Sequence, residues 1–143
     1  MTYQKWEYRD GTVIVEKYTG ELDLNTIRAN DDAMFEAIQE NVSRLLILTD
    51  LSKASLKNIS FTDVEQIFSP ILKYESITYG MKLALYVGLD DYEVFMKASK
   101  YAENDTRHPV SIIPFNFLET AMTWLGLSEA EQELITAQLV NQD

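Results

Sequence analysis

The sequence predicts an α/β fold: a single domain, residues 1–143, with a mixed sheet of four to five strands, an amino-terminal β-hairpin and four to five helices. Three observations predict it. Two segments rich in aromatic and β-branched residues flank Asp10-Gly11, apolar runs typical of strands then alternate with apolar stripes at helical spacing, and the chain length suits one domain. Strands that alternate with helices form a largely parallel sheet through right-handed crossovers, to which the hairpin adds one antiparallel strand.

The first half of the chain predicts strand, strand, helix and strand. Tyr3 to Arg9 and Thr12 to Thr19 form the hairpin, because Asp-Gly is the strongest short hairpin signal. Asp23 to Glu40 has apolar residues at helical spacing and predicts a helix. Leu45 to Leu48 is apolar on both alternation phases, as in a central strand covered on two faces. The change of polarity at Thr49-Asp50 predicts the carboxyl end of that strand.

The second half continues the alternation. A helix is expected from about Thr62, kinked by Pro70, and it is followed by a strand over Met81 to Val87. Asp90-Asp91 opens the next helix, since acidic residues suit a helix's positive end. Val110 to Ile113 lies between two prolines and predicts an edge strand, because proline cannot donate to a ladder. Two more helices are expected, an apolar stripe over Phe117 to Leu125 and a helix from the capping box of Ser128 and Glu131 to about Val140.

Charge and composition narrow the classes of function. The chain has 23 acidic and 12 basic side chains, a formal charge of -11, which disfavours nucleic acid and anionic membrane surfaces as partners. No stretch approaches the roughly 20 apolar residues of a membrane span. The start lacks the apolar core of a secretory signal and there is no cysteine, so we expect a cytoplasmic protein without disulfides.

Residues that could support catalysis are few. The one histidine, His108, has no cysteine nearby, and because a metal site needs several such ligands we expect a solvated loop residue. The pairs Asp31-Asp32 and Asp90-Asp91 point about 100° apart on a helix rather than at one substrate atom, which favours solvated helix surfaces. No glycine-rich phosphate loop, nucleophile elbow or zinc spacing occurs. The sequence therefore predicts no enzyme, no cofactor and no metal site.

Four short segments carry a resemblance to a known family: Gly20-Glu-Leu-Asp, Leu-Thr-Asp50-Leu-Ser, Ala84-Leu-Tyr-Val-Gly88 and Ala121-Met-Thr-Trp-Leu125. With its order of elements, the chain resembles the SpoIIAA-like proteins of the STAS superfamily of anti-sigma-factor antagonists, in particular those of the STAS/SEC14 type. The resemblance spans about Tyr3 to Leu125. It implies a regulatory, non-enzymatic domain that recognises proteins or binds a lipid-like molecule.

The antagonists of this superfamily carry Asp-Ser-Ser-Gly after the central strand, and a partner kinase phosphorylates the second serine. Aligned without gaps, this chain reads Asn58-Ile-Ser60-Phe61, so Ser60 matches that serine while the aspartate and the glycine are replaced. Ser60 and Thr62 each stand three residues before an acidic side chain, as helix amino-terminal caps do. We expect a cap here rather than a phosphorylated switch.

Two candidate sites follow from this reading. One is a partner-binding rim beyond the central strand, where open α/β sheets bind ligands; its residues are Asp50, Ser52, Ser55, Asn58, Ser60 and Thr62. The other is an apolar groove between the second and third helices for a lipid-like ligand, formed by Phe68, Ile71, Leu72, Tyr74, Phe95 and Met96. The alternative for the rim is that its side chains only form hydrogen bonds that organise a loop. The alternative for the groove is that the kink at Pro70 only wraps the second helix over the sheet. The expected partner is a protein, which includes a second copy in a dimer.

Overall fold

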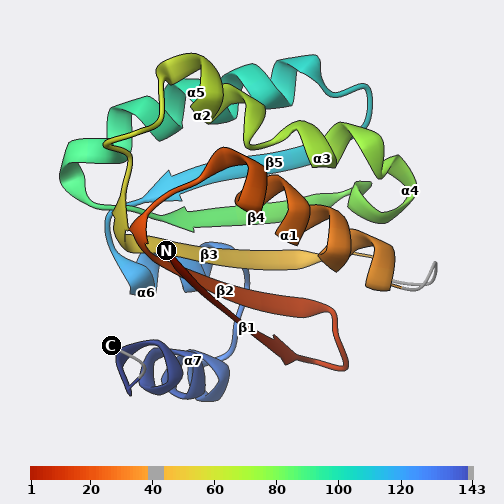
Figure 1. Ribbon diagram of the computed structural model, residues 1–143. Helices are drawn as coiled ribbons and strands as arrows, with labels where there is room; N and C mark the ends of the chain where they lie inside the picture. Colours follow the sequence, from red (N-terminus) through yellow and green to blue (C-terminus); the bar gives the residue numbers. More distant parts are fainter. Residues whose placement is uncertain (39–43, 142–143) are drawn as a thin grey trace.

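A computed structural model describes residues 1–38 and 44–141, and a five-stranded sheet lies at its centre (Figure 1). The strands lie side by side in chain order: β1 (Thr2–Tyr8), β2 (Val13–Glu21), β3 (Leu46–Ser55), β4 (Met81–Tyr86) and β5 (Val110–Phe115). β1 is antiparallel to β2, and every other neighbouring pair is parallel. The predicted fold class, an α/β fold with a mixed sheet and an amino-terminal hairpin, is confirmed.

The helices cover both faces of the sheet. One face carries α1 (Leu24–Ala37), α2 (Phe61–Gln66), α3 (Ser69–Lys73), α4 (Glu75–Thr78) and, after the short 3-10 turn η1 (Leu89–Asp91), α5 (Tyr92–Asp105). The other face carries α6 (Leu118–Trp124) and α7 (Glu129–Asn141). The sheet therefore separates two apolar cores, and its central strands are buried on both sides.

Strand alternation assigns side chains to the two cores. In β2, Ile14 and Tyr18 pack under α1 to α5, whereas Val13 and Val15 pack against α6 and α7. β3 divides in the same way, which is why its amino-terminal half is apolar on both alternation phases. Glu16 is two residues from both Ile14 and Tyr18, so its side chain points to the same face of the sheet. The strand therefore places a carboxyl group in the core under α1 to α5.

Two predicted boundaries were wrong. β3 does not end at Thr49-Asp50 but continues to Ser55, because β2 extends beside it and supplies ladder partners for Lys53 to Ser55 beyond a register shift. The expected kinked helix is three short helices, and Pro70 lies in the first turn of α3, where the missing N–H has no helical acceptor to lose. A proline that fits a helix start thus separates α2 from α3.

Other local predictions are confirmed. β5 is an edge strand, and it includes Pro114 at its end. Ser128 and Glu131 form the expected capping box of α7: the Glu131 N–H donates to Ser128 Oγ (3.2 Å) and the Ser128 N–H donates to Glu131 Oε1 (2.8 Å). Arg9, from the hairpin turn, donates to both carboxylate oxygens of Glu131 at 2.6 Å and so joins the hairpin to α7.

Candidate functional site

The expected rim begins with residues that are used inside the sheet. Asp50 is buried, and one of its oxygens accepts from the Ser52 N–H (2.9 Å) and the Ser52 hydroxyl (2.6 Å). Ser55 Oγ accepts from the Lys57 N–H (3.2 Å) and shapes the following turn. Because β3 continues past Asp50, this residue lies within the strand rather than on a rim.

The later rim residues lie at the surface. The Asn58 side-chain amide donates to Glu21 (2.7 Å), and Thr62 is exposed in the first turn of α2. Ser60 is the N-cap of α2: its hydroxyl accepts from the Asp63 N–H (3.2 Å), and the Asp63 carboxylate accepts from the Ser60 N–H (3.3 Å). The predicted cap at Ser60 is confirmed, and Thr62 does not fill that role.

Large apolar side chains lie exposed at the same edge of the sheet. Phe61 is 46% exposed, Leu89 80% and Phe117 72%, and they follow β3, β4 and β5 respectively. Since these strands are parallel, the three loops project from one edge, and we call residues 56–61, 87–91 and 116–117 the carboxyl-edge rim. The sequence pattern missed Phe117, because this residue continues the apolar stripe of α6 and was expected in the core.

The expected apolar groove is divided between surface and interior. Phe68 and Leu72 line a surface groove of about 200 Å³ between α2, α3 and α5. Ile71 and Phe95 face the core instead. Tyr74 donates its hydroxyl to Glu36 (2.8 Å), and Met96 is half-buried on α5. The six residues do not form one groove.

An interior cavity of about 40 Å³ lies between the sheet, helices α1, α3 and α5 and the connection from α2 to α3. Its wall is mostly apolar, and it includes Met34, Ile47, Leu85 and Phe95. Two carboxyl groups and two hydroxyl groups interrupt this wall: Glu16, Asp31, Tyr18 and Thr49. We call this space the interior cavity.

Glu16 is held firmly in the core. It is 2% exposed, accepts from the Tyr3 hydroxyl (2.7 Å) on one carboxyl oxygen and from the Thr49 hydroxyl (2.9 Å) on the other. Burial raises the pKa of Glu16 above its usual range, opposed by these two hydrogen bonds. Burial, and then the charge of Glu16, also raises the pKa of Tyr3 and of Tyr18.

Asp31 lies on α1 and shares the cavity wall with Glu16. The residue is partly exposed, but burial of its carboxyl, followed by the charges of Glu16 and Asp32, raises its pKa well above the usual range. The expectation that Asp31-Asp32 is a solvated pair is therefore wrong for Asp31, while Asp32 forms an ion pair with Lys73 (3.6 Å). Spacing could have revealed this, because Asp31 is four residues from both Ile27 and Phe35, on the buried side of the helix.

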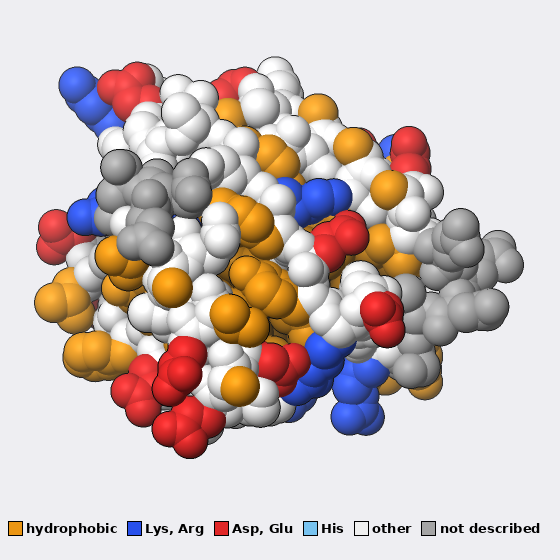
Figure 2. Space-filling model, turned by 90° about the horizontal axis from the view of Figure 1, so that it is seen from below, with side chains coloured by type: hydrophobic (Ala, Val, Ile, Leu, Met, Phe, Trp, Pro, Cys, Tyr) orange, Lys and Arg blue, Asp and Glu red, His pale blue; other side chains and the backbone are white. Residues whose placement is uncertain are grey.

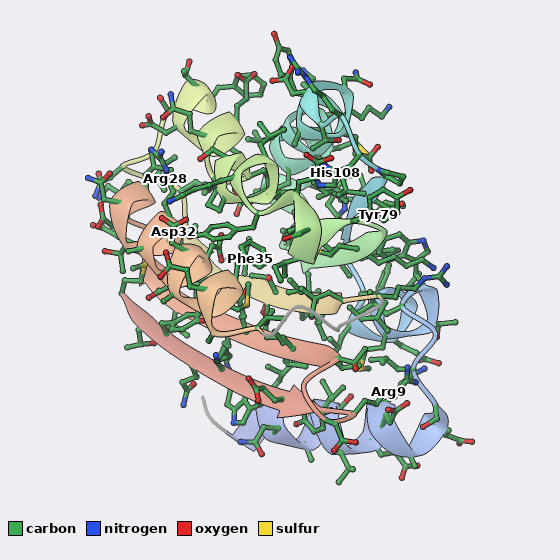
Figure 3. All side chains as sticks on the ribbon, turned by 90° about the vertical axis from the view of Figure 1, so that its right-hand side faces the viewer. Arg9, Arg28, Asp32, Phe35, Tyr79 and His108 are labelled. Atoms are coloured by element: carbon green, nitrogen blue, oxygen red, sulfur yellow. The ribbon has the colours of Figure 1, made fainter. Side chains whose placement is uncertain are left out.

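His108 is buried, which corrects the expectation of a solvated loop residue. Its Nε2 lies 2.7 Å from the Thr78 hydroxyl, and the Tyr79 ring stacks over it with ring centroids 6.4 Å apart (Figure 3). This histidine joins the end of α4 to the start of β5. Among the residues that the structure describes, no group of three His, Cys, Asp or Glu side chains could hold a metal ion.

Comparison with protein-family models and with curated proteins gives no match for this chain. No helix in the described part of the chain is long and apolar enough to cross a membrane. The geometry of the carboxyl-edge rim and of the interior cavity is therefore the basis for inferring function.

Proposed function

We propose that this chain is a cytoplasmic, non-enzymatic regulatory domain of the STAS-like type that binds a protein partner through the carboxyl-edge rim. The observation that carries the proposal is the exposure of Phe61, Leu89 and Phe117 on three loops at one edge of the sheet. Loops beyond the carboxyl ends of parallel strands are the usual binding positions of open α/β sheets.

The energetics favour these side chains as anchors. Full burial of a Leu or Phe side chain contributes about 1.5–3 kcal/mol, and a few such anchors supply most of the affinity of a protein interface. Figure 2 shows the face that carries α6 and α7, where acidic side chains cluster at one edge. That cluster lies on the α6 and α7 face rather than on the rim, and the net charge of -11 is the property that suits a partner with a basic or mixed surface. A second copy of the chain is one such protein partner.

Site-specific photo-crosslinking tests this proposal. A photoreactive phenylalanine analogue would replace Leu89 or Phe117, and the control would carry it at Leu134, which is 63% exposed on α7 away from the rim. In cells of the native host, we expect discrete cross-linked species from the two rim positions and none from Leu134. Cross-linking from Leu134 alone, or from no position, would contradict the proposal.

The second candidate function is a carrier or sensor of a small apolar molecule, and the interior cavity favours it. Its wall combines side chains expected in the apolar groove, Phe68, Ile71 and Phe95, with apolar residues of the sheet. About 40 Å³ is room for two or three non-hydrogen atoms, so this space fits a small molecule rather than a lipid chain. Native mass spectrometry of protein purified from its own host is the test, and we expect a retained small-molecule mass. A spectrum of the bare chain alone would count against a carrier.

A further inference from the structure

A surface groove of about 680 Å³ lies between helices α6 and α7. Apolar side chains of both helices line it: Leu118 and Met122 from α6, and Ala137 and Val140 from α7. Figure 2 shows the face of the molecule that carries both helices, with apolar side chains exposed at its centre. None of the residues of the carboxyl-edge rim lines this groove, so it is a second surface.

Helix α7 has apolar residues on more than one side. Ile135 and Leu139 are buried in the core against the sheet, whereas Ala137 and Val140 lie in the groove and Val140 is 59% exposed. The side of a surface helix that faces away from the core is typically polar. An apolar surface outside the core is typical of a contact with another molecule.

The groove is acidic as well as apolar. Glu119, Glu129 and Glu133 line it and are exposed, and the sequence has no Lys or Arg in residues 108–143. Within the part of the chain that the structure describes, none of these three glutamates forms an ion pair. Exposed carboxylates beside an apolar surface are complementary to a partner that carries positive charge beside apolar side chains.

We infer that the groove between α6 and α7 binds a basic amphipathic helix of another protein. The apolar side of that helix packs against Leu118 and Val140, and its Lys or Arg side chains lie beside Glu129 and Glu133. Docking of an amphipathic helix in an apolar groove is a recurrent mode of peptide recognition. The inference goes beyond the proposed function, because it concerns a different surface and a defined class of partner.

Charge separates this partner from other occupants. A two-fold dimer through the groove uses the same surface on both subunits, so the three glutamates of one copy would face those of the other. Like charges across an interface oppose association. The same carboxylates repel nucleic acid and anionic membrane surfaces. A basic helix is the occupant that satisfies both the apolar walls and the glutamates.

Fluorescence anisotropy of labelled peptides mixed with the full chain tests the inference. The probe is a helical peptide of about 18 residues with leucine along one side and lysine on the other. One comparison peptide has glutamate in place of every lysine, and a second has the same leucine and lysine residues in scrambled order. We expect the probe to bind with a Kd in the micromolar range and each comparison peptide to bind at least about tenfold more weakly.

Paired glutamine variants separate the groove from a general attraction to an acidic protein. The double variant Glu129→Gln, Glu133→Gln should weaken binding of the probe by about three- to tenfold, because two ion pairs with the peptide are lost. The control, Glu75→Gln with Glu93→Gln, removes the same charge from exposed positions on α4 and α5. We expect this control to change the Kd by less than about twofold.

Paired serine variants test the apolar contact. Val140→Ser should weaken binding of the probe by about fivefold, whereas Leu134→Ser, exposed on α7 outside the groove, should stay within about twofold. Equal effects of the two glutamine variants, or of the two serine variants, would overturn the groove as the site. Equal binding of all three peptides, or no binding, would overturn the basic helix as the partner. A wild-type dimer that Val140→Ser converts to a monomer in sedimentation would place a second copy in the groove and overturn the inference.

Discussion

The raised pKa of the Asp31 carboxyl predicts that Asp31→Asn stabilises the protein at neutral pH. The substitution keeps the shape of the side chain and removes its negative charge from a wall that it shares with Glu16. Burial raises the pKa of Asp31, so the folded state binds more protons than the unfolded chain between the usual Asp value and the raised one. The free energy of unfolding of the wild type therefore rises as pH falls through that window.

The size of the effect follows from the size of the pKa shift. A carboxyl whose pKa differs between the folded and unfolded states changes the free energy of unfolding by about 1.4 kcal/mol for each pH unit of that difference. For a chain of 143 residues the entropy of unfolding is about 0.3 kcal/mol/K, so each gain of about 1 kcal/mol raises Tm by roughly 3 °C.

Thermal unfolding followed by circular dichroism at pH 7 and near pH 4 is the assay. We expect Asp31→Asn to raise Tm at pH 7 and to lose most of that advantage near pH 4, which is close to the usual Asp pKa of about 3.9. Asp10→Asn, at an exposed position of the hairpin turn with positive φ, is the control and should change stability by less than about 0.5 kcal/mol. A lower Tm for Asp31→Asn at pH 7, or an undiminished gain at pH 4, would refute the account of a carboxyl whose pKa is raised in the folded state.

Three further outcomes are expected. In urea titration, Ser60→Ala should lower the free energy of unfolding by about 1 kcal/mol, whereas Thr62→Ala should change it little. Ser60→Asp should keep both the fold and partner binding, and substantial phosphorylation of Ser60 in the native host would restore the switch interpretation. Glu131→Gln should lower the free energy of unfolding by about 0.5–1 kcal/mol at pH 7, because the Arg9 hydrogen bonds lower the Glu131 pKa to about 2. This loss of stability should be complete above about pH 4.5 and should vanish as the pH falls toward 2, so a loss that does not depend on pH would contradict the prediction. Sedimentation at tens of micromolar, about the concentration for a modest interface, should show a dimer, and a monomer alone would remove self-association from the proposal.

The features that could be predicted from the sequence are those decided by nearby residues. The Asp10-Gly11 turn fixes the hairpin, because residues 9 to 11 all adopt positive φ there. The capping boxes at Ser60 and Ser128 each need only two residues three apart. The edge position of β5 follows from its prolines, which restrict its hydrogen bonding.

The features that could not be predicted depend on contacts between distant segments. β3 extends to Ser55 only because β2 lies beside it, and nothing within residues 50–55 reports that neighbour. The interior cavity needs a strand residue, Glu16, and a helix residue, Asp31, to meet after the chain crosses over the sheet. Ser52 and Asp50 looked like a surface pair because the length of the strand was unknown.

Two errors of the sequence interpretation coincide with two of the proposed binding regions. Asp31 was expected in solvent and lies at the wall of an apolar cavity, whereas Phe117 was expected in a core stripe and is exposed. Desolvation raises the pKa of the Asp31 carboxyl at this wall, and Phe117 exposes an aromatic ring at the edge of the sheet that also exposes Phe61 and Leu89. A protein partner that covers the carboxyl-edge rim would bury Phe117, and departures from local rules concentrate at functional sites.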